Sequence, residues 1–68
     1  MLYEEAIEAE WTGERVLFEG HKYRVIGHKA IGNSGHFTFT IQRIVLGVPY
    51  QPIEIGEQTL ACLRRAKQ

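Results

Sequence analysis

Hydrophobic and polar residues alternate along three segments of the chain, 15–19, 22–28 and 36–42. Each segment is rich in Val, Ile, Thr, Tyr and Phe, and glycines separate the segments. Because successive side chains of a β-strand point to opposite faces of the sheet, this alternation predicts strands with one buried face. We therefore expect an antiparallel sheet over the first two thirds of the chain.

The glycines between these segments predict how the strands pair. A two-residue turn at residues 20–21, with glycine first, places Phe18 opposite Tyr23. Closing the second hairpin symmetrically through residues 29–35 places Tyr23 opposite Ile41. The two hairpins then agree on a single core face, made of Val16, Phe18, Tyr23, Val25, Phe37, Phe39 and Ile41.

The opposite face of the predicted sheet is polar and mostly basic. Lys22 and Arg24 lie on it, next to threonines and a glutamine of the third strand. Leu17 and Ile26 are apolar residues on this same face. Something is expected to cover them, and the two candidates are the N-terminal segment of the same chain and a second copy of the protein.

The alternation fails after the third strand, where parity puts Arg43 on the core face. A β-bulge near Arg43 would turn Ile44 and Leu46 inward. A further strand is predicted over residues 50–55, and because Pro52 cannot donate to a ladder, that strand is expected at an edge of the sheet.

The two ends of the chain carry mixed signals. Residues 2–11 place apolar side chains at near-helical spacing, which favours a helix over a strand. Residues 57–67 begin acidic and end basic, as a helix dipole prefers, with a short strand over residues 59–63 as the alternative.

Together these elements predict a mainly β, small α+β fold in a single domain, residues 1–68. Four or five short antiparallel strands form a curled meander, with short helical segments at one or both termini. This architecture resembles an SH3-like or partly open barrel. The resemblance concerns architecture alone and implies no functional residues.

The charges add an asymmetry to this picture. Eight basic and eight acidic residues give a net charge of zero, and 44% of the residues are hydrophobic. Residues 1–19 hold six glutamates and one arginine, whereas residues 20–53 contain no acid. The two blocks either neutralise each other within the fold or mark a site for a charged partner. No segment resembles a membrane span or a signal peptide, so the expected location is the cytoplasm.

Few residues could support catalysis or hold a metal. One cysteine, Cys62, excludes an internal disulfide, and its apolar neighbours predict a buried thiol. Ser34 has no aspartate to complete a catalytic triad, because the chain contains none. The predicted register places His28 beside His36, where they could hold a metal with a third ligand. Two hydrated histidines are the favoured interpretation, and no metal or cofactor is predicted.

The remaining candidates concern anionic ligands. Residues 27–36 are glycine-rich but lead into a strand, which does not fit a phosphate loop. Lys29, Asn33 and Ser34 are contact candidates at the tip of this hairpin. Arg43, together with a glutamate and a histidine, could serve a small acid-base ribonuclease, although a surface role at a bulge is favoured.

The leading hypothesis is a non-enzymatic binding module that acts through a protein-protein interface, as a regulator or inhibitor would, and that is itself a homodimer. A nucleic-acid or nucleotide-phosphate binder that uses the basic face is the alternative, and a small acid-base ribonuclease is third. Trp11 and Tyr50 are the aromatics that the core explains least, although a core position is favoured for Trp11. The candidate partner-binding residues are Lys22, Arg24, Lys29, Arg43, Trp11 and Tyr50, with Leu17 and Ile26 as apolar contacts.

Overall fold

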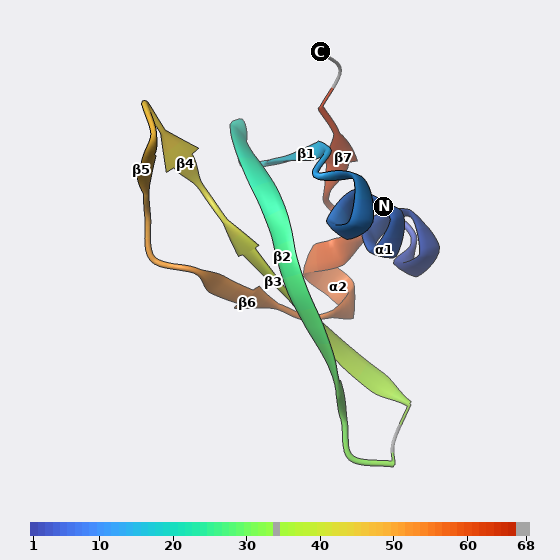
Figure 1. The fold of residues 1–68 in the computed structure, drawn as a ribbon. Coiled ribbons are helices and arrows are strands. Elements are labelled where there is room, and N and C mark those ends of the chain that lie inside the picture. The colour runs from blue at the N-terminus through green and yellow to red at the C-terminus, as the bar shows by residue number, and fades with distance from the viewer. Residues whose placement is uncertain (34, 67–68) are drawn as a thin grey trace.

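The computed structural model describes residues 1–33 and 35–66, and its centre is a five-stranded antiparallel sheet (Figure 1). The strand order across this sheet is β6, β3, β2, β1, β7, so β6 and β7 form its edges. A separate two-stranded sheet pairs β4 with β5. In chain order the elements are α1 (Tyr3–Thr12), β1 (Arg15–Phe18), β2 (His21–Ile31), β3 (His36–Gln42), β4 (Ile44–Val45), β5 (Val48–Pro49), β6 (Ile53–Ile55), α2 (Glu57–Leu60) and β7 (Arg64–Arg65).

Helix α1 confirms the helix predicted for residues 2–11. At its start, the Leu2 N–H donates a hydrogen bond to the Glu5 carboxylate at 2.8 Å, and negative charge is favourable at this end of a helix. At its end, Gly13 adopts a left-handed conformation, with φ 76°, and its N–H donates to the Ala9 carbonyl at 2.9 Å. These contacts satisfy backbone groups at both ends and direct the chain into β1.

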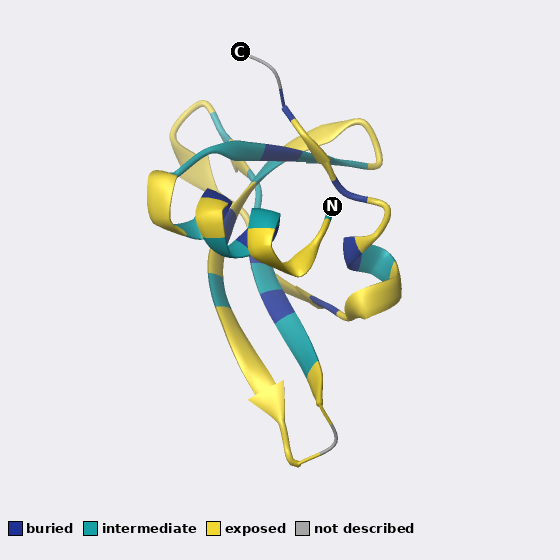
Figure 2. Ribbon diagram, turned by 90° about the vertical axis from the view of Figure 1, so that its right-hand side faces the viewer, coloured by how far each residue is buried: buried dark blue, intermediate teal, exposed yellow. Residues whose placement is uncertain are grey.

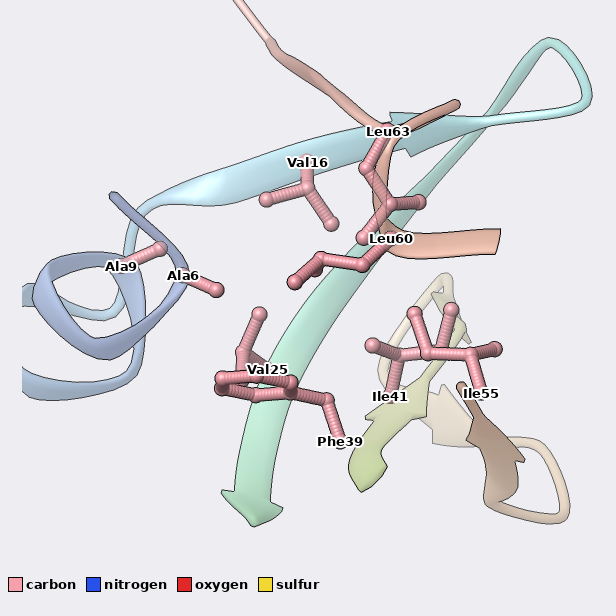
Figure 3. Packing of buried hydrophobic residues seen from close by; sticks show 9 residues of the cluster. All are labelled: Ala6, Ala9, Val16, Val25, Phe39, Ile41, Ile55, Leu60 and Leu63. Carbon is pink, nitrogen blue, oxygen red and sulfur yellow. The ribbon is translucent and has the colours of Figure 1, made fainter. Parts of the chain in front are cut away.

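The hydrophobic core lies between the two helices and one face of the main sheet (Figure 3). Helix α1 contributes Ala6 and Ala9, whose small side chains let the helix pack close to the strands, and α2 contributes Leu60. In Figure 2 the buried residues gather in this interior, whereas the end of the β2–β3 hairpin is largely exposed. The predicted core face is confirmed: Val16, Val25, Phe39 and Ile41 are buried, and Phe18, Tyr23 and Phe37 pack against them.

In the first hairpin, β1 and β2 pair in a different register from the predicted one, although their side chains lie on the predicted faces. Its turn residues are Glu19 and Gly20, with φ of 52° and 78°, the positive values that a type I′ turn requires. Val16 therefore lies opposite Tyr23, whereas the sequence predicted Phe18 there. The error is two residues, and because side chains alternate with a period of two, every side chain keeps its predicted face.

A β-bulge at Ile26 interrupts β2. Val25 pairs regularly with β3, but the next paired residue of β2 is Gly27. Because Ile26 is the extra residue, the alternation is inverted from there to the end of the strand. The core face beyond the bulge therefore carries His28 and Ala30, opposite Phe39 and Phe37.

Strand β3 pairs with β6 without the bulge predicted near Arg43. Ile53 lies opposite Ile41, and Ile55 lies opposite Phe39, so both isoleucines of β6 meet the core face directly. β6 has β3 as its only neighbour in the sheet, which confirms the predicted edge strand, although it is shorter than residues 50–55.

The predicted inward positions of Ile44 and Leu46 are wrong. After Gln42 the chain leaves the main sheet and forms the β4–β5 hairpin, in which Val45 pairs with Val48. Ile44 is exposed there, and Leu46 is 97% exposed. The apolar run after β3 thus forms a projecting hairpin in place of a continuation of the core.

The C-terminal segment differs from both of its predictions. The helix expected over residues 57–67 ends after one turn, and the alternative strand over residues 59–63 is wrong, because the chain forms the short strand β7 only after that segment. This strand pairs with β1, so that Arg64 lies opposite Leu17 and Arg65 lies opposite Val16. The N-terminal ammonium group donates to the Leu63 carbonyl at 3.0 Å, which joins the two ends of the chain.

The fold class is therefore mainly β, with antiparallel sheets and a helix near each terminus, as predicted. The SH3-like curl is not confirmed, since the main sheet is an open sheet with β6 and β7 at its edges. No helix of the described residues is long and apolar enough to cross a membrane.

Phe39 is the largest fully buried side chain, and its removal tests the core. We expect Phe39→Ala to lower the free energy of unfolding by about 3–5 kcal/mol, which is most of the stability of so small a domain. Phe37→Ala, at a partly buried position, is the matched control and should cost less. Thermal unfolding followed by circular dichroism measures both, and similar losses for the two variants would contradict this description of the core.

Candidate interaction site

Four basic side chains share one patch on the outer face of the main sheet, the face opposite the core. Arg15 of β1 lies opposite Arg24 of β2, and Leu17, the next outer-face residue of β1, lies between Lys22 on β2 and Arg64 on β7. We call Arg15, Lys22, Arg24 and Arg64 the basic patch. Leu17 is half-buried at its centre.

No carboxylate of the described residues neutralises the charges of the basic patch. None of its four side chains forms an ion pair within the described residues. The Arg15 guanidinium donates to the Gly13 carbonyl at 3.4 Å, and the Arg24 guanidinium also lies beside Gly13. Both arginines therefore lie by the C-terminal end of α1, where the helix dipole favours positive charge. Their charges remain available to carboxylates or phosphates of a partner.

Other basic residues of the chain are already engaged. Lys29 forms an ion pair with Glu54 at 3.0 Å. Arg65 contacts two glutamates of α1, the nearer at 3.1 Å. The guanidinium carbon of Arg43 lies 5.3 Å from the centroid of the Tyr50 ring, a cation-π contact. Of the predicted basic site, Lys22 and Arg24 therefore lie together, whereas Lys29 and Arg43 have separate contacts.

Two members of the basic patch, Arg15 and Arg64, are absent from the partner-binding residues predicted from the sequence. Arg15 was placed on the correct face, but only the observed register brings it opposite Arg24. Arg64 was assigned to a helix, and a two-residue strand leaves no periodic pattern from which to find it. The balance of three bases over two acids after residue 53 was the only signal for it.

Leu17 and Ile26 are partly open, as an interface requires. Ile26 is 44% exposed in the bulge of β2. Helix α1 packs against the other face of the sheet, through Ala6 and Ala9, so the first of the two candidate covers, the N-terminal segment, is wrong. The second candidate, another copy of the protein, remains a prediction.

The two histidines predicted to lie side by side are apart. The bulge moves His28 opposite Phe39, and its Nδ1 lies 2.7 Å from the Glu10 carboxylate of α1. His36 lies opposite Ile31, and its Nδ1 is 3.4 Å from Glu57 of α2. No group of three metal-ligating side chains occurs within residues 1–33 and 35–66. These contacts connect the sheet to its helices and do not form the predicted pair.

The catalytic candidates gain no support from their surroundings. Cys62 is exposed, not buried as its neighbours predicted, and its Sγ lies 3.7 Å from the Gln58 carbonyl. Ser34 lies outside the described residues, and Asn33 is exposed at the hairpin end. Arg43 contacts Tyr50. The two histidine-glutamate pairs lie elsewhere, one with a glutamate of α1 and one with a glutamate of α2. The groups required for the ribonuclease hypothesis are thus in separate contacts.

Trp11 and Tyr50 are both exposed. Trp11 is 84% exposed on α1, so the favoured core position is wrong, because Ala6 and Ala9 form the packed side of that helix. Tyr50 follows β5 and stacks with Arg43. Neither aromatic lies on β1, β2 or β7, the strands that carry the basic patch.

No protein-family model matches the chain, and no similar protein was found among curated sequences or solved structures.

Charge reversal within the basic patch should stabilise the fold. Lys22→Glu places a carboxylate beside the remaining bases of the patch and away from the end of α1, and we expect the free energy of unfolding to rise by about 0.2–0.5 kcal/mol. Lys29→Glu, on the same strand, is the matched control: it breaks the ion pair with Glu54 and should lower stability. Urea denaturation at low salt measures both changes, and destabilisation by Lys22→Glu would contradict the assignment of unneutralised charge to the patch.

Proposed function

We propose that this protein is a non-enzymatic binding module that recognises an acidic surface of a partner protein through the basic patch. One observation carries the proposal: four bases lie together around Leu17 without a carboxylate partner among the described residues. Arg15 and Arg24 lie directly opposite each other, and like charges in that position repel. Carboxylates of a partner would remove this repulsion on binding.

The apolar centre of the patch favours a protein over a nucleic acid. Half-buried Leu17 and exposed Ile26 offer contacts to aliphatic side chains, and a charged rim around an apolar centre is the usual anatomy of a protein interface. Proteins that bind single-stranded nucleic acid stack bases on exposed aromatic rings. The aromatic residues of β1, β2 and β3 pack on the core face: Phe18, Tyr23, Phe37 and Phe39.

The chemistry of the patch further defines the partner. Three of its four bases are arginines, whose planar guanidinium groups bind carboxylates through two parallel hydrogen bonds. A partner segment with alternating acidic and aliphatic residues would place carboxylates on the arginines and an aliphatic group on Leu17. Cys62 is a free, exposed thiol, which suits a reducing compartment, so we place this function in the cytoplasm.

A direct binding assay tests the proposal. The probes are an alternating Glu-Leu peptide, an alternating Glu-Ser peptide of equal length, and a uridine oligonucleotide of equal charge. We expect the Glu-Leu peptide to bind the protein at least about tenfold more tightly than the other two, a difference of about 1.4 kcal/mol. The double variant Lys22→Glu, Arg24→Glu should lose this binding, and Leu17→Ser should remove the preference for the Glu-Leu peptide.

The control is Lys29→Glu, which reverses one charge outside the basic patch and should bind as the wild type does. Tighter binding of the oligonucleotide than of either peptide would favour the nucleic-acid hypothesis and overturn the proposal. Unchanged peptide binding by the double variant would also overturn it.

A further inference from the structure

The C-terminal end of α1 brings two guanidinium groups of the basic patch to one residue, Gly13. The Arg15 guanidinium donates to the Gly13 carbonyl at 3.4 Å. Arg24, which lies opposite Arg15, reaches the same glycine from β2. A β-carbon added to Gly13 would lie 3.1 Å from Nη2 of Arg24 and 3.7 Å from its guanidinium carbon. Side chains of two neighbouring strands therefore meet at the end of the helix.

Gly13 has two separate reasons to be a glycine. It adopts a φ of 76°, the left-handed conformation that ends α1, which a residue without a β-carbon reaches without strain. The second reason is the Arg24 guanidinium, because a side chain at residue 13 would displace it from the position that it now occupies. Gly20, in the β1–β2 turn, has a φ of 78°, but no described atom lies within 4 Å of a β-carbon added there. The contact with Arg24 is thus a property of Gly13 and not of left-handed glycines in general.

The end of α1 also explains how two like charges can lie together. The last carbonyl groups of a helix carry a partial negative charge, which offsets the repulsion between the two arginines. These contacts hold both side chains in the free protein. An arginine loses much rotational freedom when it binds a ligand, so holding it beforehand reduces the entropic cost of binding.

Most of the hydrogen-bonding capacity of this pair is unused. A guanidinium group has several N–H donors in one plane and stays charged at any ordinary pH. Arg15 uses one donor on Gly13, and Arg24 makes no hydrogen bond or ion pair with any residue that the structure describes. Glu14, the acid nearest to Gly13 in the sequence, is also absent from the ion pairs of the described residues.

We infer that Arg15 and Arg24 form a clamp for one carboxylate, and that Gly13 is the positioning residue that holds Arg24 in this clamp. The two oxygens of a carboxylate can each accept hydrogen bonds, so a single group can bind both arginines. The ligand is a side-chain carboxylate of the acidic partner, so the clamp rests on the proposed function. Leu17, two residues after Arg15 on the same face of β1, then meets the neighbouring aliphatic side chain of the partner.

Nuclear magnetic resonance of the arginine side chains tests the clamp with a simple carboxylate. The probe is N-acetylglutamate amide, and the uncharged control is N-acetylglutamine amide. In the wild type, the Nε–H signals of Arg15 and Arg24 should shift together, with one common midpoint. Arg43, which lies over the Tyr50 ring, should keep its signal unchanged. The glutamine compound should shift none of them.

The role of Gly13 is tested with a matched pair of variants, Gly13→Asn and Gly20→Asn. Asparagine tolerates the left-handed conformation, so both variants should keep the wild-type circular dichroism spectrum. We expect Gly13→Asn alone to weaken binding of the alternating Glu-Leu peptide about tenfold, as for the loss of one charge-assisted hydrogen bond. In a protein that already carries Arg24→Gln, Gly13→Asn should weaken peptide binding no further, because its effect passes through Arg24.

The outcomes separate the clamp from the proposed function. Peptide binding that Gly13→Asn leaves unchanged overturns the clamp, while the proposed function stands. The clamp is also overturned if Gly13→Asn weakens binding equally with Arg24 present and absent, since residue 13 then acts only through the stability of α1. Joint shifts of Arg15 and Arg24 in a protein that does not bind the peptide support the clamp and overturn the proposed function. Different midpoints for the two arginines, or no shift of either, overturn the clamp even if Gly13→Asn does not fold.

Discussion

The packing of two helices against one face of the main sheet is the interaction on which the rest of this structure depends. Val16, Val25 and Phe39 form its centre, and the small side chains Ala6 and Ala9 let α1 approach them closely. A chain of this length has only enough apolar surface for one such core. Because both helices pack on that face, the basic patch on the outer face has no ion pair from the described residues.

This division of the sheet explains why its charges collect where they do. Arg65 points to the covered side and binds glutamates of α1, whereas its neighbour Arg64 points outward and lies beside Leu17. Because successive side chains of a strand point to opposite faces, these two adjacent arginines lie on opposite faces of the sheet and have different contacts. A net charge of zero conceals this arrangement, since the acidic helix neutralises one side of the sheet and leaves the basic patch on the other.

Most of the core could be predicted from the sequence, and the errors have physical causes. The first hairpin was wrong by two residues, which left every face correct because the strand period is two. The bulge at Ile26 adds a single residue, so it inverted the face of His28 and removed the predicted histidine pair. Arg64 was missed because a two-residue strand has no periodic signal, and Leu46 was wrongly placed inward because the turn at Leu46 and Gly47 ends the alternation.

The central claim is that one face of the sheet maintains the fold while the other is available to a partner. Nuclear magnetic resonance during titration with the alternating Glu-Leu peptide tests it most directly, because backbone amide shifts report each strand separately. The account predicts the largest shifts at Arg15, Leu17, Lys22, Arg24 and Arg64, with the amides of α2 and of the first turn of α1 nearly unchanged. Shifts concentrated on the two helices, with the basic patch unaffected, would contradict it.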